Sequence, residues 1–308
     1  MTRLRIIHDT TYRYRKPVTF GPHRLVLRPR EGHDVDVAAM TIEVQPAFEL
    51  TWSRDVFGNS IATLELTATS DVLHIRSHVL LDRTDHGDQA SAALRALEYP
   101  VTYSPLESAM ATVYLALSYP DDEAAVRAFV SDTLHLAARG DVARALTVLN
   151  DSINTRFEYR RRERKGTQPP AETLSLGAGS CRDLATLFME CARALGIAAR
   201  FASGYLDCAA SAVGRAATHA WCEVYLPDNG WCGFDPTLGE QTSHKHVVVG
   251  VSNHPRGVMP ISGVFTGDTG DYLGLEVTVQ IEKVGADAAL SSPDLDDVAD
   301  DGPSAVET

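Results

Sequence analysis

Gly177-Ala-Gly-Ser-Cys-Arg-Asp-Leu-Ala185 is the stretch that decides the fold, because it places a cysteine where a loop becomes a helix. Ser180 and Asp183 match the [Ser/Thr]-x-x-[Asp/Glu] capping pattern, so Ser180 is the expected N-cap and Cys181 the first helical residue. Apolar side chains then recur at helical spacing and form a stripe typical of a buried face: Leu184, Leu187, Phe188, Cys191 and Leu195. Gly196 is expected to end this helix.

The first turn of a helix gives Cys181 a special environment. Backbone N–H groups there are unpaired and the helix dipole is positive, and both effects favour the thiolate, which is the nucleophilic form. The same N–H groups could hold an oxyanion, and Ser180 is a tentative contact in that role. Cys181 alone could equally be a buried structural cysteine. A catalytic role requires a base and an orienting residue elsewhere in the chain.

A strand is expected directly after the helix, over residues 197–206. Tyr205 lies near its end and is a tentative substrate or oxyanion contact. The competing interpretation is that Tyr205 is a structural aromatic residue. Helix, tight turn and strand together form a compact unit with Cys181 at one end.

A hairpin is expected over residues 218–237, around the turn Pro227-Asp-Asn-Gly230. Alternation in its first strand places His219, Trp221, Glu223 and Tyr225 on one face. The opposite face is expected to be core and carries Ala220, Cys222, Val224 and Leu226.

The register of this hairpin decides whether His219 and Asp235 can meet. A three-residue loop pairs Leu226 with Gly230 and puts Asp235 on the face of His219, one diagonal step away. A two-residue loop would turn Asp235 toward the core. With the first register, Cys181, His219 and Asp235 supply a nucleophile, a base and an orienting carboxylate.

Each of these residues also has a structural interpretation. His219 could be a satisfied sheet histidine, and Asp235, which precedes a proline, could be a turn former. Trp221 shares the face of His219 and is a tentative substrate contact. Two further histidines, His74 and His78, share one face of an earlier strand and are expected to be exposed or paired across strands.

Composition limits the class of protein. The chain has 308 residues and a formal net charge of −13, which argues against nucleic acid or an anionic membrane as the main partner. No apolar run approaches the roughly 18 residues of a membrane span, and the N-terminus lacks the apolar core of a secretory signal. Five cysteines without a CxxC pair indicate neither a complete disulfide framework nor a zinc site. A reducing, cytoplasmic setting is expected.

The chain is expected to have four parts. Residues 1–85 read as a β-rich domain, with strands near 4–14, 35–44, 61–67 and 72–80 that suggest a small sandwich. Residues 86–150 read as a helical connecting region. Residues 151–283 are expected to be the catalytic core with C-terminal strands, and residues 284–308 an acidic, disordered tail. The basic cluster at residues 160–165 is either a solvated loop or a patch that steers substrate.

Four blocks of the chain resemble the bacterial transglutaminase-like proteins, and they come in the expected order. They are Gly179-Ser-Cys-Arg-Asp-Leu-Ala185, Arg193-Ala-Leu-Gly-Ile-Ala-Ala-Arg-Phe-Ala-Ser-Gly-Tyr205, Thr218-His-Ala-Trp221 and Gly230-Trp-Cys-Gly-Phe-Asp-Pro-Thr237. The N-terminal region resembles the β-rich N-terminal domain of the same group through His8-Asp-Thr-Thr-Tyr12, Leu27-Arg-Pro-Arg30 and Asp55-Val-Phe-Gly-Asn59.

The resemblance implies an α+β fold in which a β-sandwich-like domain precedes a papain-like core, with the nucleophile at a helix N-terminus packed on an antiparallel sheet. It implies that Cys181 is the nucleophile, His219 the general base and Asp235 the residue that orients His219. Nothing in the sequence resembles the calcium loops of animal transglutaminases, so no metal or other cofactor is expected.

The expected activity is acyl transfer from a protein or peptide substrate through a thioester. Hydrolysis of peptide or glutamine-type amide bonds is favoured, and protein-glutamine transamidation is the alternative. A non-catalytic peptide-binding scaffold is a second alternative, which the intact three-residue set argues against. Metal binding or redox sensing by Cys181 and His219 is a third, weakened by the lack of a closed ligand set. The oligomeric state is left open.

Overall fold

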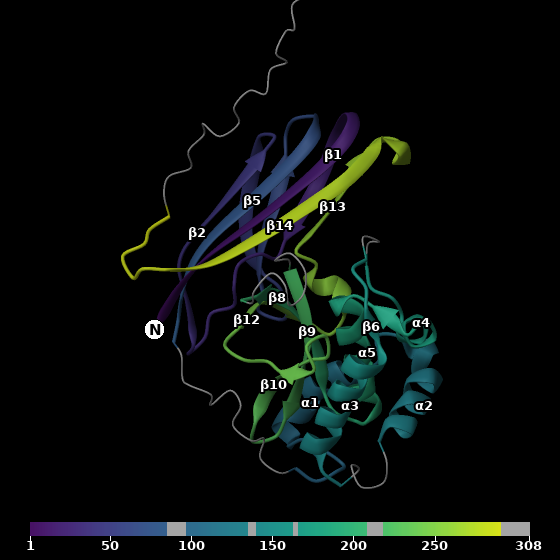
Figure 1. Ribbon diagram of the computed structural model, residues 1–308. Coiled ribbons are helices and arrows are strands. Elements are labelled where there is room, and N and C mark those ends of the chain that lie inside the picture. The colour runs from purple at the N-terminus through teal and green to yellow at the C-terminus, as the bar shows by residue number, and fades with distance from the viewer. Residues whose placement is uncertain (85–96, 135–139, 163–165, 208–217, 291–308) are drawn as a thin grey trace, which may run out of the picture.

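The computed structural model describes residues 1–84, 97–134, 140–162, 166–207 and 218–290, and it consists of a β-rich region beside a helical core (Figure 1). The expected acidic tail lies mostly outside these residues. The predicted α+β fold class is confirmed.

The β-rich region is built around one long strand, β1. Its strands are β1 (Thr2–Leu25), β2 (Val35–Gln45), β3 (Phe48–Arg54), β4 (Ser60–Leu66), β5 (Ser70–Arg83), β13 (Ile261–Thr266) and β14 (Tyr272–Val284). The first half of β1 pairs with β5 and β14, and its second half pairs with β4 and β13. Apolar residues of β1 and of the strands paired with each of its halves share one hydrophobic cluster, among them Leu25, Leu64 and Ile75. This shared cluster gives the region its sandwich-like form.

The C-terminal strands correct the predicted organisation. Residues up to 283 were expected to complete the catalytic core, but β13 and β14 pair with β1 of the N-terminal sheet. Thr10 lies opposite Val277, a partner more than 260 residues further along the chain. Alternation shows that a segment is a strand and cannot show which distant strand it joins.

The core combines a five-stranded antiparallel sheet with helices, as far as the described residues show. The sheet order is β11-β10-β9-β8-β12, and its strands are β8 (Ala199–Leu206), β9 (Thr218–Leu226), β10 (Gly230–Asp235), β11 (Glu240–Gln241) and β12 (His246–Ser252). The helices are α1 (Pro105–Leu115), α2 (Glu123–Thr133), α3 (Val142–Arg156), α4 (Pro170–Leu176) and α5 (Cys181–Ala194). Two short strands, β6 (Glu158–Tyr159) and β7 (Ala178–Gly179), pair in parallel just before α5.

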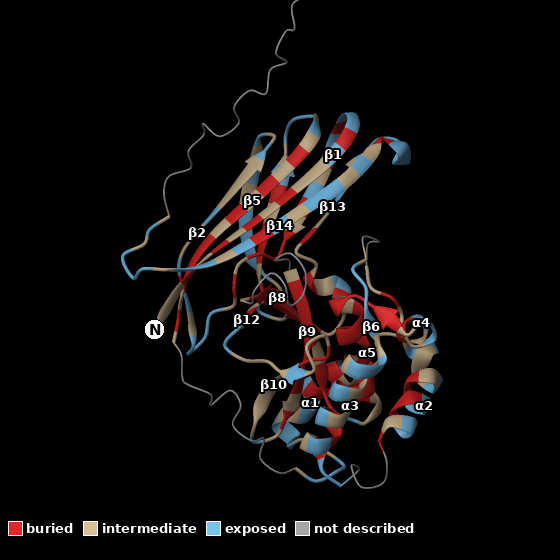
Figure 2. Cartoon of the chain, viewed as in Figure 1, coloured by how far each residue is buried: buried red, intermediate tan, exposed pale blue. Residues whose placement is uncertain are grey.

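Helix α5 is the centre of the core. It lies against one face of the sheet, and the buried residues of both appear in red in Figure 2. The predicted apolar stripe is confirmed, since Leu184, Leu187, Phe188 and Cys191 are all at most 1% exposed. Helices α2 and α3 pack into the same cluster, so the segment predicted as a connecting region contributes directly to the core. None of the described helices is long and apolar enough to cross a membrane.

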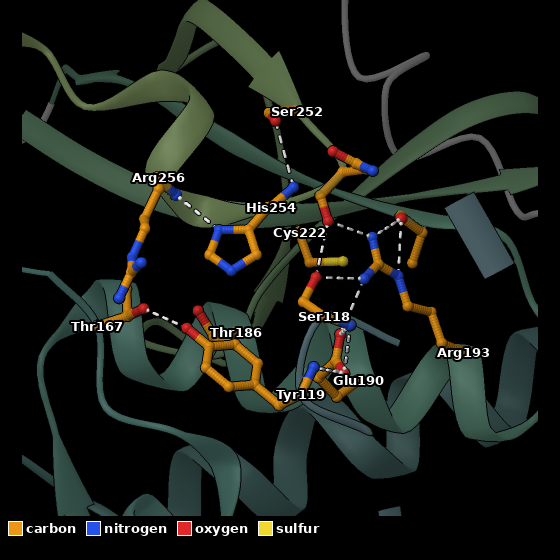
Figure 3. Close-up of polar contacts among 12 residues, drawn as sticks. Ser118, Tyr119, Thr167, Thr186, Glu190, Arg193, Cys222, Ser252, His254 and Arg256 are labelled. Atoms are coloured by element: carbon orange, nitrogen blue, oxygen red, sulfur yellow. Dashed lines mark hydrogen bonds and ion pairs between the residues drawn. The ribbon is translucent and has the colours of Figure 1, made fainter. Parts of the chain in front are cut away.

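A buried ion pair fastens α5 to two loops (Figure 3). Glu190 pairs with Arg193 at 2.9 Å, and the Glu190 carboxylate also accepts from the Ser118 N–H at 3.0 Å. Arg193 donates to the Ser118 hydroxyl and to the carbonyls of Ala199 and Asn253. A buried pair is tolerated only when its remaining donors and acceptors are satisfied, and here they are.

Candidate active site

Cys181 begins α5, as predicted, and its side chain is mostly buried. The preceding Ser180 donates both its backbone N–H and its hydroxyl to Asp183 Oδ2, each at 2.8 Å. Arg162 and the Gln168 N–H also donate to the Asp183 carboxylate. Both donors of Ser180 are therefore used in capping the helix, and these contacts give no support to its predicted oxyanion role.

The remaining described cysteines lie in less reactive surroundings. Cys191 and Cys222 are fully buried, and burial raises the pKa of both thiols far above the ordinary value. Burial also raises the pKa of Cys232, to about 11. Cys208 lies outside the described residues. Cys181 differs from the other three because it stands at a helix N-terminus and next to an imidazole.

The predicted hairpin register is confirmed. Gly230 pairs with Leu226 and the ladder continues to Phe234 opposite Cys222, which leaves a three-residue loop. Asp235 therefore falls on the His219 face, and His219 Nε2 lies 2.6 Å from Asp235 Oδ2. The opposite face of β9 packs against α5, as expected.

His219 lies between a carboxylate and a thiol. Its Nε2 is engaged by Asp235, which leaves Nδ1 as the ring nitrogen available to Cys181. Burial by itself would lower the pKa of His219, but hydrogen bonds and charge at Asp235 and Cys181 outweigh it and raise that pKa to about 10. The surroundings of His219 therefore favour its protonated, positively charged form.

Asp235 is fully buried and surrounded by donors. Its Oδ1 accepts from the backbone N–H groups of Thr237 at 2.9 Å and Leu238 at 3.3 Å. Its Oδ2 accepts from two imidazoles, His219 at 2.6 Å and His246 at 3.1 Å. Burial would raise the pKa of Asp235, yet these hydrogen bonds hold it well below the usual range, so the carboxylate stays charged.

His246, the first residue of β12, is a site residue that the sequence reasoning missed. The Ser243 N–H donates to His246 Nδ1 at 3.1 Å, so Nδ1 is an acceptor and Nε2 must carry the proton. That proton points to Asp235 Oδ2. His246 belongs to no motif, and its contact arises only when β12 folds beside β8.

The two tentative aromatic contacts have other surroundings. Tyr205 is 1% exposed, belongs to the cluster between the two sheets, and places its hydroxyl 3.1 Å from His8 Nδ1. It therefore does not line the site, and the structural interpretation holds. Trp221 is fully buried, with its ring edge-on to His246 at 5.1 Å and tilted to His219 at 6.3 Å. Trp221 therefore packs against both imidazoles within the protein interior.

His219, Asp235 and His246 also form a group with metal-ligand chemistry, since their candidate ligand atoms lie within 4.8 Å of one another. The hydrogen bonds among them already account for all three side chains, because one carboxylate oxygen accepts from both rings. This donor set therefore fits a hydrogen-bonded relay better than a closed tetrahedral metal site.

Comparisons with known proteins agree with this architecture. The model of the transglutaminase-like superfamily matches residues 133–236, and the model of the bacterial transglutaminase-like N-terminal region matches residues 4–82. An uncharacterized protein of Mycobacterium tuberculosis is 29% identical over 291 residues, which is 90% of this chain and 92% of the relative. An uncharacterized protein of Mycobacterium leprae is 23% identical over 291 residues, covering 92% of this chain and 100% of the relative.

One solved structure shares the whole architecture. It is a protein of Cytophaga hutchinsonii named as a candidate cysteine protease, and the match covers 94% of this chain and 92% of that one. The TM-score is 0.70 at 18% sequence identity, so the likeness establishes the common fold.

Proposed function

Because this chain carries a transglutaminase-like core and a bacterial transglutaminase-like N-terminal region, we propose that it is a cysteine-dependent acyl-transfer enzyme. Cys181 is the nucleophile, His219 the acid–base group and Asp235 the residue that orients His219. The observation that carries the proposal is the 2.6 Å contact of His219 with a buried carboxylate, beside a cysteine that begins a helix.

The proposed reaction starts from the Cys181 thiolate and the His219 imidazolium. The sulfur attacks an amide carbonyl, and the resulting oxyanion is stabilised by the free N–H groups at the start of α5. His219 then gives its proton to the leaving amine as the C–N bond breaks, which leaves a thioester on Cys181. Asp235 keeps the imidazole ring in place throughout.

The acceptor in the second step decides the overall reaction. Water gives hydrolysis, and a primary amine gives transamidation. We favour hydrolysis of a peptide or glutamine-type amide in a protein or peptide substrate, because the Cytophaga protein of the same fold is named as a candidate cysteine protease. A reducing compartment such as the cytoplasm fits this proposal, since it preserves the Cys181 thiol.

The two outcomes are separated by supplying glutamine-containing peptides together with a labelled primary amine, and by measuring both ammonia and incorporated label. Hydrolysis predicts ammonia release or peptide cleavage without incorporation, and no product with Cys181→Ala. Incorporation of one label for each ammonia released would replace the hydrolase by the transamidase. Product formation that survives Cys181→Ala would overturn the assignment of the nucleophile.

A further inference from the structure

The segment that precedes α5 brings a basic stretch next to the nucleophile. Tyr159 of β6 pairs in parallel with Gly179 of β7, two residues before Cys181, and the Arg160 N–H donates to the Gly179 carbonyl at 2.8 Å. Residues 159–161 therefore run alongside the N-terminus of α5, which is where a substrate would approach Cys181. Tyr159 is 40% exposed there.

Two of the arginines around this mouth are already neutralised. Arg160 pairs with Glu158 at 2.6 Å on the surface, and Arg162 pairs with the buried Asp183 at 2.7 Å. These carboxylates are thereby occupied and cannot balance further cations.

Two further arginines, Arg161 and Arg182, have no carboxylate within 4.0 Å among the described residues. Arg161 is exposed, and Arg182 donates to the Arg162 carbonyl at 3.2 Å, which holds its guanidinium beside the 160–162 segment. Burial raises the pKa of Tyr159, negative charge on Cys181 raises it further, and Arg161 and Arg182 lower it. All four side chains therefore lie within electrostatic range of one another.

We propose that Tyr159, Arg161 and Arg182 form a subsite that binds a carboxylate of the acyl-donor substrate next to Cys181. The inference rests on the proposed function and adds the substrate class: peptides with a carboxylate close to the reacting amide. Arginine is well suited to this task because its planar guanidinium binds carboxylates through two hydrogen bonds. Two cations without a carboxylate partner in the described part of the chain, in a protein of net charge −13, are a local reversal of sign that attracts an anionic substrate.

Alkylation of Cys181 by iodoacetate and by iodoacetamide tests this subsite without any substrate. The reagents differ mainly in one carboxylate, so the ratio of their rates reports the charge around the sulfur. Arg161→Gln and Arg182→Gln should each lower the iodoacetate-to-iodoacetamide ratio about threefold at low salt, and the effect should shrink at high salt. The matched control is the double variant Glu158→Gln/Arg160→Gln, which removes the neighbouring ion pair without changing the net charge, so its ratio should stay unchanged.

The neutral reagent also verifies that each variant is folded, since its rate should remain that of the wild type. An unchanged ratio in both variants, or an equal fall in the Glu158→Gln/Arg160→Gln control, would overturn the subsite. That result would leave the proposed acyl transfer standing, whereas an unreactive Cys181 in the wild type would count against the acyl transfer itself. Protection by N-acetylglutamate amide, compared with protection by N-acetylalanine, identifies whether the carboxylate belongs to a side chain or to a chain end.

Discussion

At the scale of single residues, the centre of the site is the carboxylate of Asp235, one oxygen of which accepts hydrogen bonds from two imidazoles. His219 is hydrogen-bonded to Cys181, and in the proposed reaction it exchanges a proton, whereas His246 is held by Ser243 with its proton on Nε2. His246 is therefore a positioning residue. In the proposed mechanism its hydrogen bond helps to keep Asp235 charged and fixed, and through Asp235 it aligns His219.

Replacing His246 tests that positioning role. His246→Leu removes one hydrogen bond to a buried carboxylate. Because a hydrogen bond to a charged group contributes about 1.5–3 kcal/mol, we expect kcat/KM to fall about tenfold or more. The acid limb of the pH profile should move to higher pH because Asp235 loses a donor. His246→Gln places an amide N–H near the same position and should restore most of the activity. Equal loss in both variants with an unmoved acid limb would mean that His246 only packs.

Residue-scale prediction from the sequence succeeded for contacts that local geometry determines. The contact of His219 with Asp235 follows from strand alternation and loop length, and the position of Cys181 follows from a capping pattern. His246 and Tyr205 could not be placed, because their surroundings depend on which strands lie beside β8 and on how the two sheets dock.

At the scale of elements, contacts near the C-terminus of α5 fix the position of the helix and therefore of Cys181 at its N-terminus. The Glu190–Arg193 pair ties the helix to the Ser118 loop and to the carbonyls of Ala199 and Asn253 (Figure 3). The pair is buried, so removing one partner leaves a charge without compensation.

We expect Glu190→Ala to lower the free energy of unfolding by about 3–5 kcal/mol, because Arg193 stays buried and unpaired. Glu123→Ala is the control: Glu123 pairs with Arg127 on the surface of α2, and its loss should cost no more than about 0.5 kcal/mol. Urea denaturation of both variants measures the difference. Similar small losses in the two proteins would show that the buried network does not hold the helix.

The elements themselves were mostly predictable. The α5 stripe and the β9–β10 hairpin carry strong periodicity, and both formed as expected. Strand β3 was not predicted, although apolar Phe48, Leu50 and Trp52 alternate with polar residues; the strand is short and mostly exposed. The placement of β13 and β14 depends on pairing with β1 at the other end of the chain, which no local pattern encodes.

At the scale of the whole molecule, the N-terminal region supports the strand that carries His246. Asn59 makes two hydrogen bonds to the backbone of Val251, and the Arg30 N–H donates to the Val248 carbonyl. Both contacts fall on β12. The N-terminal region is therefore coupled to the site through this strand.

His8 makes the junction between the two sheets sensitive to acid. It is buried against Tyr205 and Thr10, and burial lowers its pKa from 6.5 to about 4. The unfolded chain binds a proton at this residue between pH 6.5 and 4 while the folded chain does not, so stability falls as the pH drops through that window.

We expect His8 to account for at most about 3 kcal/mol of the fall in the free energy of unfolding between pH 6.5 and 4. Urea denaturation at several pH values should show a shallower loss of stability for His8→Gln than for the wild type between pH 6.5 and 4. Parallel pH dependences would show that His8 does not stay neutral at the junction.

Activation of Cys181 by His219 is best examined through the rate at which iodoacetamide alkylates Cys181, measured as a function of pH. In the wild type, hydrogen bonds and charge at Asp235 and Cys181 outweigh burial and raise the pKa of His219, and the protonated ring should keep alkylation fast down to about pH 6. His219→Ala should slow the reaction at pH 6 more than tenfold and require alkaline pH to recover. Coincident rate profiles for the two proteins would contradict the account.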